Sequence, residues 1–155
     1  MRRYNNNYRR RYKTKRPVNR VIQAATTAVP PNSNAVGYLF TCLDPCTSTR
    51  FALDTGLRPP SSSSINPVAY ALVYVPDGYN VNNITYPTVA GTNMYEPSMN
   101  VLISGILTDD TTEDHKFCRY SRKMNTGDRI ALIYYNSDTT NTVDCSFELN
   151  FTTVH

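Results

Sequence analysis

The sequence predicts an all-β body that carries a basic N-terminal arm. Strong helix formers are scarce after residue 20, where only two Lys, three Glu and one Gln occur. Val, Ile, Thr, Tyr and Phe dominate instead, with Pro, Asn, Ser and Gly between them, which is typical of short strands joined by turns. No stretch repeats apolar residues with the period of an amphipathic helix. About eight strands in one body favour an antiparallel two-sheet sandwich in the form of a single jelly roll.

The individual strands follow from the spacing of apolar residues and turn residues. Segments 68–75 (VAYALVYV) and 100–108 (NVLISGILT) are apolar on both faces and should lie deep in the sandwich. Gly105, inside the second segment, is expected to mark a bulge or a close approach of another chain segment. Segment 143–154 alternates apolar and polar residues, as a half-buried strand does. The other expected elements are strands at 18–28, 36–43, 50–53, 117–124 and 129–135, and a surface loop at 56–64.

The first twenty residues form the arm, and residues 21–155 form the body. The arm holds nine basic residues and no acid, whereas the body holds seven basic residues and twelve acids, so the charges are +9 and 7 − 12 = −5. Because these like charges repel one another, the arm should be disordered in isolation. We expect its binding partner to be a polyanion. Lys and Arg bind nucleic acid through salt-sensitive, sequence-independent release of counterions. The nine cations are Arg2, Arg3, Arg9, Arg10, Arg11, Lys13, Lys15, Arg16 and Arg20.

Three tyrosines, Tyr4, Tyr8 and Tyr12, recur every four residues among these cations. On a helix they would form one stripe. In an extended arm they would stack on unpaired bases, which contributes roughly 1–3 kcal/mol per base. The run 5–7 of three Asn and the helix-stopping Pro17 favour the extended interpretation. The same basic run is typical of a nuclear localisation signal, a role compatible with nucleic-acid binding.

The body contains one basic cluster, segment 116–123 (KFCRYSRK). Its cations would project from both faces of a strand, which indicates an edge or partly exposed strand. They could guard an open edge against mispairing, contact nucleic acid, or contact an acidic neighbour, and the sequence leaves these roles open. The four cations of this candidate secondary patch are Lys116, Arg119, Arg122 and Lys123.

An acidic segment precedes this cluster and offers Asp109, Asp110, Glu113 and Asp114 within six residues. Carboxylate oxygens are the ligands that Ca²⁺ prefers, which makes these residues a candidate calcium site. The spacing is not that of an EF-hand, so a solvated loop is favoured. Pairing with basic residues of a neighbouring copy is a third interpretation.

The four cysteines are expected to be free thiols in a reducing compartment, mostly buried as small apolar residues. Zinc ligation by Cys42, Cys46, Cys118 and His115 is a minor alternative. The chain has only two histidines and no phosphate-binding glycine loop or nucleophile elbow. We therefore expect neither an enzyme nor a cofactor. No apolar run approaches the ~20 residues of a membrane span, and the N-terminus lacks a secretory signal, so membrane insertion is not expected.

Three segments carry a resemblance to a known family: 71–78 (ALVYVPDG), 94–105 (MYEPSMNVLISG) and 121–130 (SRKMNTGDRI). Their order and the basic arm resemble the circovirus-like capsid proteins of small circular single-stranded DNA viruses that encode a replication initiator. The resemblance covers the arm in character and residues 70–135 in motif order. The motifs are strand and turn signatures and carry no catalytic group.

The resemblance implies a viral jelly roll that assembles into an icosahedral T=1 shell of about sixty copies. The arm would point inward onto a packaged single-stranded DNA genome. It also implies location in the virion, passage through the host nucleus during assembly, and contacts with a nuclear import receptor and a host surface receptor.

Two alternatives remain beside the DNA-virus capsid. A coat protein of a small single-stranded RNA satellite virus would keep the fold, and nothing in the arm is specific for the 2′-hydroxyl that separates RNA from DNA. A cellular β-barrel protein that binds single-stranded nucleic acid belongs to a different class. It would place stacking aromatic residues on a basic barrel face, whereas this body is acidic overall.

Overall fold

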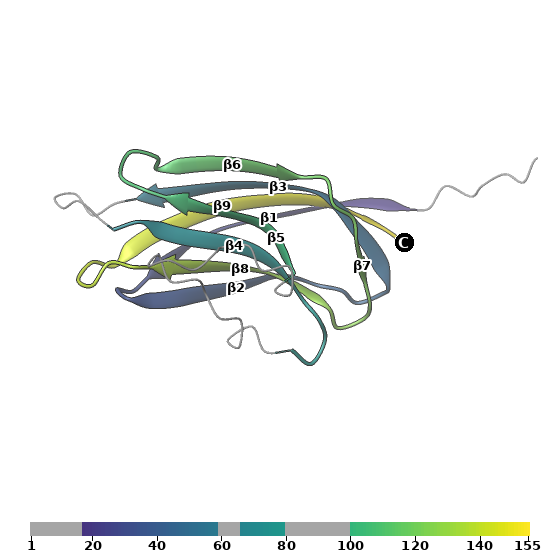
Figure 1. Cartoon of the computed structure of the whole chain (residues 1–155). Coiled ribbons are helices and arrows are strands. Elements are labelled where there is room, and N and C mark those ends of the chain that lie inside the picture. Colours follow the sequence, from purple (N-terminus) through teal and green to yellow (C-terminus); the bar gives the residue numbers. More distant parts are fainter. Residues whose placement is uncertain (1–16, 59–65, 80–99) are drawn as a thin grey trace, which may run out of the picture.

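The computed structural model describes residues 17–58, 66–79 and 100–155, and the structural statements below concern these residues. They form nine β-strands and contain no helix (Figure 1). None of them belongs to an apolar helix long enough to cross a bilayer. The strands are β1 (Val18–Val29), β2 (Ser33–Thr41), β3 (Cys46–Arg58), β4 (Val68–Val75), β5 (Val101–Leu107), β6 (Glu113–Cys118), β7 (Arg122–Met124), β8 (Arg129–Asn136) and β9 (Val143–Val154).

The strands make two antiparallel sheets that pack face to face (Figure 1). One sheet has the order β1-β9-β3-β6, with β7 also paired to β3, and the other has the order β2-β8-β4-β5. The pairs are therefore nested along the chain: β1 pairs with β9, β2 with β8, β3 with β6 and β7, and β4 with β5. Successive pairs alternate between the sheets, which is the double Greek-key wrap of a jelly roll. This confirms the predicted fold class.

The hydrophobic core lies between the sheets. All eight residues of β4 are buried, which confirms the prediction that this segment lies deep in the sandwich. The rings of Phe51 and Phe151 stack across β3 and β9 with their centroids 5.3 Å apart. Full burial of one large apolar side chain contributes roughly 1.5–3 kcal/mol to the stability of the folded state. The packed interior therefore holds the two sheets, and the surface residues that they carry, in a fixed arrangement.

Strand β3 is longer than the sequence predicts. The expected strand at 50–53 is the middle of Cys46–Arg58, and the first three residues of the expected loop at 56–64 belong to the same strand. The sequence does not reveal the full strand because the β3–β9 register breaks between Thr49 and Ala52, where Arg50 has a φ of 59°. This bulge shifts which residues face the core, so β3 lacks the strict alternation that identifies a half-buried strand.

The expected single strand at 117–124 is two strands in the structure. Strand β6 pairs with residues 51–56 of β3, and β7 pairs with residues 46–48. The β3 bulge lies between these two ladders, so one straight neighbour cannot pair with both halves. Strand β6 begins at Glu113, and Glu113 and Asp114 pair with Gly56 and Thr55 of β3, so the expectation that these two acids belong to a loop was wrong.

Candidate nucleic-acid interface

The predicted arm meets the folded body at the start of β1. His155 donates its backbone N–H to the carbonyl of Pro17 at 3.3 Å, so the point where the arm joins lies beside the C-terminus (Figure 1). Arg20 is exposed on β1, and its Nη2 donates to Oδ1 of Asn150 at 3.0 Å. The other predicted arm contacts, Arg2, Arg3, Tyr4, Tyr8, Arg9, Arg10, Arg11, Tyr12, Lys13, Lys15 and Arg16, lie outside the described residues.

Of the four cations in the predicted secondary basic patch, Arg122 is half-buried and turned toward β4. Its guanidinium carbon lies 4.0 Å from the centroid of the Tyr74 ring. Its Nη2 donates to Oδ1 of Asn100 at 2.5 Å. A cation over an aromatic face at this distance contributes about 0.5–2 kcal/mol. Arg122 therefore fixes the chain between β4 and β7.

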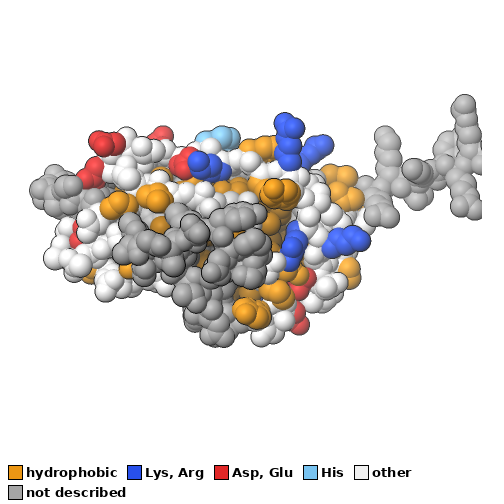
Figure 2. All heavy atoms as spheres, viewed as in Figure 1, with side chains coloured by type: hydrophobic (Ala, Val, Ile, Leu, Met, Phe, Trp, Pro, Cys, Tyr) orange, Lys and Arg blue, Asp and Glu red, His pale blue; other side chains and the backbone are white. Residues whose placement is uncertain are grey.

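The other three cations of the patch, Lys116, Arg119 and Lys123, are exposed. Lys116 Nζ lies 3.4 Å from Oδ2 of Asp114, which offsets part of its charge. Lys123 is on β7 opposite Thr47. Figure 2 shows Lys and Arg side chains grouped over the ends of β6 and β7, beside exposed hydrophobic side chains.

Two aromatic residues accompany these cations, and neither is among the predicted site residues. Phe117 is 53% exposed and Tyr120 is 74% exposed. Arg119 lies 5.9 Å from the Phe117 ring centroid. An open hollow of about 470 Å³ between β5 and β6 is lined in part by Lys116, Phe117, Arg119 and Tyr120. Exposed rings beside cations suit unpaired bases, and the signal in the sequence was the interleaving of K, F, R and Y in KFCRYSRK.

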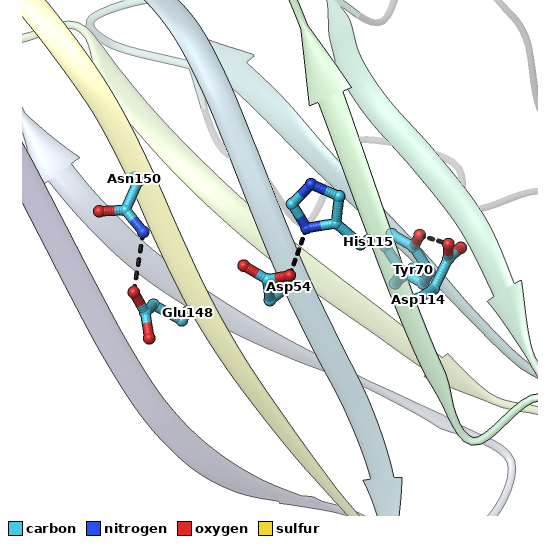
Figure 3. A network of polar contacts seen from close by, with 6 residues as sticks. All are labelled: Asp54, Tyr70, Asp114, His115, Glu148 and Asn150. Carbon is cyan, nitrogen blue, oxygen red and sulfur yellow. Dashed lines mark hydrogen bonds and ion pairs between the residues drawn. The ribbon is translucent and has the colours of Figure 1, made fainter.

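The outer face of the β1-β9-β3-β6 sheet carries an acidic hollow of about 530 Å³. Asp54 and His115 are directly opposite in the β3–β6 ladder, and their side chains form an ion pair when the imidazole is protonated (Figure 3). Glu148 accepts a 2.8 Å hydrogen bond from Nδ2 of Asn150 on the neighbouring part of this face (Figure 3). His115 is thus an exposed strand residue paired with a carboxylate.

The four carboxylates of the candidate calcium site do not lie together, because two of them precede β6 and the other two belong to it. Asp109 and Asp110 precede β6, whereas Glu113 and Asp114 are adjacent in β6 and therefore point to opposite faces. Asp114 accepts the hydroxyl of Tyr70 at 2.6 Å (Figure 3). Burial, and then this hydrogen bond, raise the pKa of Tyr70 above its ordinary value. Among the described residues, no three Asp, Glu, His or Cys side chains converge as metal ligands do.

All four cysteines are free and buried, as the sequence predicts. The Sγ atoms of Cys42 and Cys46 lie 3.6 Å apart. Burial, aided by the contact with Cys46, raises the pKa of Cys42 to about 11. Burial also raises the pKa of Cys145 to about 12. The thiols of Cys42 and Cys145 are therefore neutral packing groups at physiological pH.

Comparison with protein-family models gave no match, and comparison with curated proteins gave none either. One similar solved structure is described as the acidic stable capsid structure of Helicobacter pylori bacteriophage KHP30. It is 11% identical, with a TM-score of 0.40 over 87% of this chain and 93% of that chain. A likeness this distant defines no family and carries no functional inference. The strand order by itself gives the described residues the topology of a jelly roll.

Proposed function

We propose that this protein is a viral capsid protein whose jelly-roll body assembles into a closed shell around single-stranded DNA. The observation that carries the proposal is the separation of charge between an acid-free arm and a jelly-roll body. Residues 1–16 hold eight of the sixteen Lys and Arg and none of the twelve Asp and Glu. They join the body at one end of β1 (Figure 1), so every subunit presents its cationic segment from the same place.

This separation suits a packaging role for a physical reason. Sixty arms of +9 would carry roughly 540 positive charges, enough to offset some hundreds of phosphates. The acidic hollow around Asp54 and Glu148 repels nucleic acid from that face of the body and so favours binding through the arm. The proposal places the protein in the virion, and in the host nucleus during assembly, because the basic run also has the character of an import signal.

The first test is assembly of the purified full chain. Negative-stain electron microscopy and light scattering over a range of pH and salt should show particles of uniform size. After nuclease treatment, these particles should retain protected nucleic acid, and sequencing it distinguishes a DNA cargo from an RNA cargo. A chain that forms no particle under any of these conditions contradicts the shell function.

The second test separates the arm from the basic patch on the body. The triple variant Arg9→Gln, Arg10→Gln and Arg11→Gln should lower the salt slope of single-strand binding by about 2, because each phosphate contact contributes about 0.7. The matched body variant changes Lys116, Arg119 and Lys123 to Gln and removes the same charge. It should leave the slope unchanged. A larger loss in the body variant would overturn the assignment of the arm as the genome-binding segment.

A second candidate function is favoured by one observation, the exposed Phe117 and Tyr120 beside Arg119. A cellular protein that binds single-stranded nucleic acid would use such rings as stacking platforms. It would remain a monomer or a small oligomer, whereas a capsid protein forms particles of high mass. Multi-angle light scattering of the full chain, with and without a single-stranded oligonucleotide, distinguishes the two.

A further inference from the structure

The sandwich has four sheet edges whose outer sides pair with no other described strand. Strand β1 forms one edge of the first sheet, and β6 together with the three-residue β7 forms its other edge; β2 and β5 are the edges of the second sheet. An edge presents unpaired backbone N–H and C=O groups and recruits a strand from another chain unless charge, shortness or a bulge prevents it. The four edges of this protein differ sharply in that protection.

Three of the edges are protected. Strand β6 has six residues, of which Glu113, Asp114 and Lys116 are charged. Strand β5 has seven residues, and its ladder with β4 shifts register between Leu72 and Val73. The ladder of β2 with β8 is likewise irregular, between Tyr38 and Phe40. Each of these three strands is poorly suited to extend its sheet into a second chain.

Strand β1 has none of these protections. It runs for twelve residues, and its ladder with β9 keeps one register from Val18 opposite Val154 to Val29 opposite Val143. Its sequence, VNRVIQAATTAV, holds a single charge and no proline. Val18 is 64% exposed and Ile22 is 54% exposed. A long, regular and apolar edge of this kind is a contact surface.

The inward side of β1 is open as well. Gln23 and Ala25 are exposed although they point toward the second sheet. A hollow of about 290 Å³ lies between β1 and β2, lined in part by Ala25, Ala35, Leu39 and Phe147. A strand added to β1 would place its own inward-facing side chains over this apolar opening and remove it from water.

We propose that β1 pairs in antiparallel fashion with β1 of a second copy across a two-fold axis near Ala24. This pairing joins two sheets into one. In the proposed shell, on which this inference rests, the pairing would be one of the contacts between neighbouring copies. An isologous contact needs a self-complementary surface, and a strand with one off-centre charge meets that need. Each Arg20 would lie opposite Ala28 of the other copy, away from the second Arg20.

Charge complementarity supports this choice of partner. Ala28 is opposite Asp144 in the β1–β9 ladder, so the incoming Arg20 of the second copy would lie two strands from that carboxylate. Two strand spacings are about 10 Å, which an Arg side chain facing an Asp side chain spans across a small Ala. Within its own chain, Arg20 donates to the neutral Asn150. Pairing would therefore give an exposed cation an acidic partner.

Cysteine crosslinking tests the pairing directly. We expect a short bismaleimide to link the full-length variant Ala24→Cys into a covalent dimer, and Gln23→Cys or Ala25→Cys to do so less efficiently. The matched control is Phe117→Cys, at a position that is also exposed but lies on the protected edge strand β6, and it should give little dimer. The four native thiols are buried and compete little. Absence of a covalent dimer from all three β1 variants would overturn the proposal.

Charged variants on the same strand provide a second readout. Ile22→Lys and Thr26→Lys place cations on the exposed face of β1, where the fold has room for them. We expect the pair to weaken self-association in sedimentation at least tenfold and to leave the unfolding midpoint of the chain unchanged. Particles that form normally from this variant, without β1 crosslinks, would reject the pairing and retain the shell function. A crosslinked dimer without particles would reject the shell function and retain the pairing.

Discussion

The hydroxyl of Tyr74 donates a 2.6 Å hydrogen bond to Oδ2 of Asp128, and both residues are buried. The backbone N–H groups of Asn125 and Asp77 also donate to the Asp128 carboxylate, at 2.7 and 2.9 Å. This one side chain therefore ties β4 to the turns that follow β4 and precede β8. Burial acts to raise the pKa of Asp128. These hydrogen bonds and the nearby Arg122 outweigh it and lower the pKa below the ordinary value of 3.8.

Replacement of Asp128 by Asn should destabilise the protein by about 2–3 kcal/mol at neutral pH. The amide keeps the shape of the side chain but has one acceptor oxygen, whereas the two carboxylate oxygens of Asp128 together accept three hydrogen bonds. Urea unfolding followed by fluorescence or circular dichroism measures the loss. Tyr74→Phe removes only one donor and should cost less, about 1 kcal/mol. Equal losses in the two variants would contradict the central role of the carboxylate.

The stability of the protein should fall at acidic pH in part because the Asp128 carboxylate becomes protonated. Its pKa is lower in the folded state than in the unfolded state, so its contribution is complete above the unfolded value of 3.8. The contribution is lost as the pH falls below that value and through the folded pKa. Wild type should thus lose more stability than Asp128→Asn between pH 5 and acidic pH. Parallel stability profiles for the two proteins would show that Asp128 contributes no such slope.

Of the adjacent cations Arg122 and Lys123, only Arg122 should affect stability when it is replaced. Arg122→Gln removes the contact over Tyr74 and the hydrogen bond to Asn100, and should cost about 1–3 kcal/mol of stability. Lys123→Gln is the matched control with the same loss of charge, and should stay within about 0.5 kcal/mol of wild type. Thermal unfolding at equal ionic strength compares them. A stable Arg122→Gln protein with weakened nucleic-acid binding would return Arg122 to the predicted basic patch.

The different roles of Arg122 and Lys123 show where sequence reasoning stops. The cluster KFCRYSRK indicates exposed charge, but the break between β6 and β7 is set by the bulge at Arg50, far away along the chain. The fold itself was predictable, because segments such as 68–75 are apolar on both faces. Likewise, VNRVIQAATTAV identifies a strand. Only the topology shows that this strand is an unprotected edge.

The close approach predicted at Gly105 is confirmed, and it gives a sharp packing test. A Cβ on Gly105 would collide with the hydroxyl and ring of Tyr70, which is opposite it in the β4–β5 ladder. Gly105→Ala should therefore cost about 1–3 kcal/mol through overpacking. The matched control is Gly37→Ala on β2, where the nearest atom lies 3.6 Å away and the change should be close to neutral.

A double-mutant cycle assigns that cost to one contact. Tyr70→Leu alone should destabilise the core, since it removes a buried ring and the hydrogen bond to Asp114. In the Tyr70→Leu background, Gly105→Ala should cost at least 1 kcal/mol less than in wild type, because the ring that it strikes is gone. Additive losses would place the strain elsewhere in β5.

The native thiols should resist alkylation until the protein unfolds. The thiolate is the reactive form, and a pKa of about 11 for Cys42 leaves roughly one thiolate in a thousand at pH 8. Cys145, with a pKa of about 12, is still less ionised and has no exposed surface. Mass spectrometry after iodoacetamide should find four unlabelled cysteines in the native protein and four labelled ones in guanidinium. Rapid labelling of the native protein would show that the region around Cys42 and Cys46 opens without global unfolding.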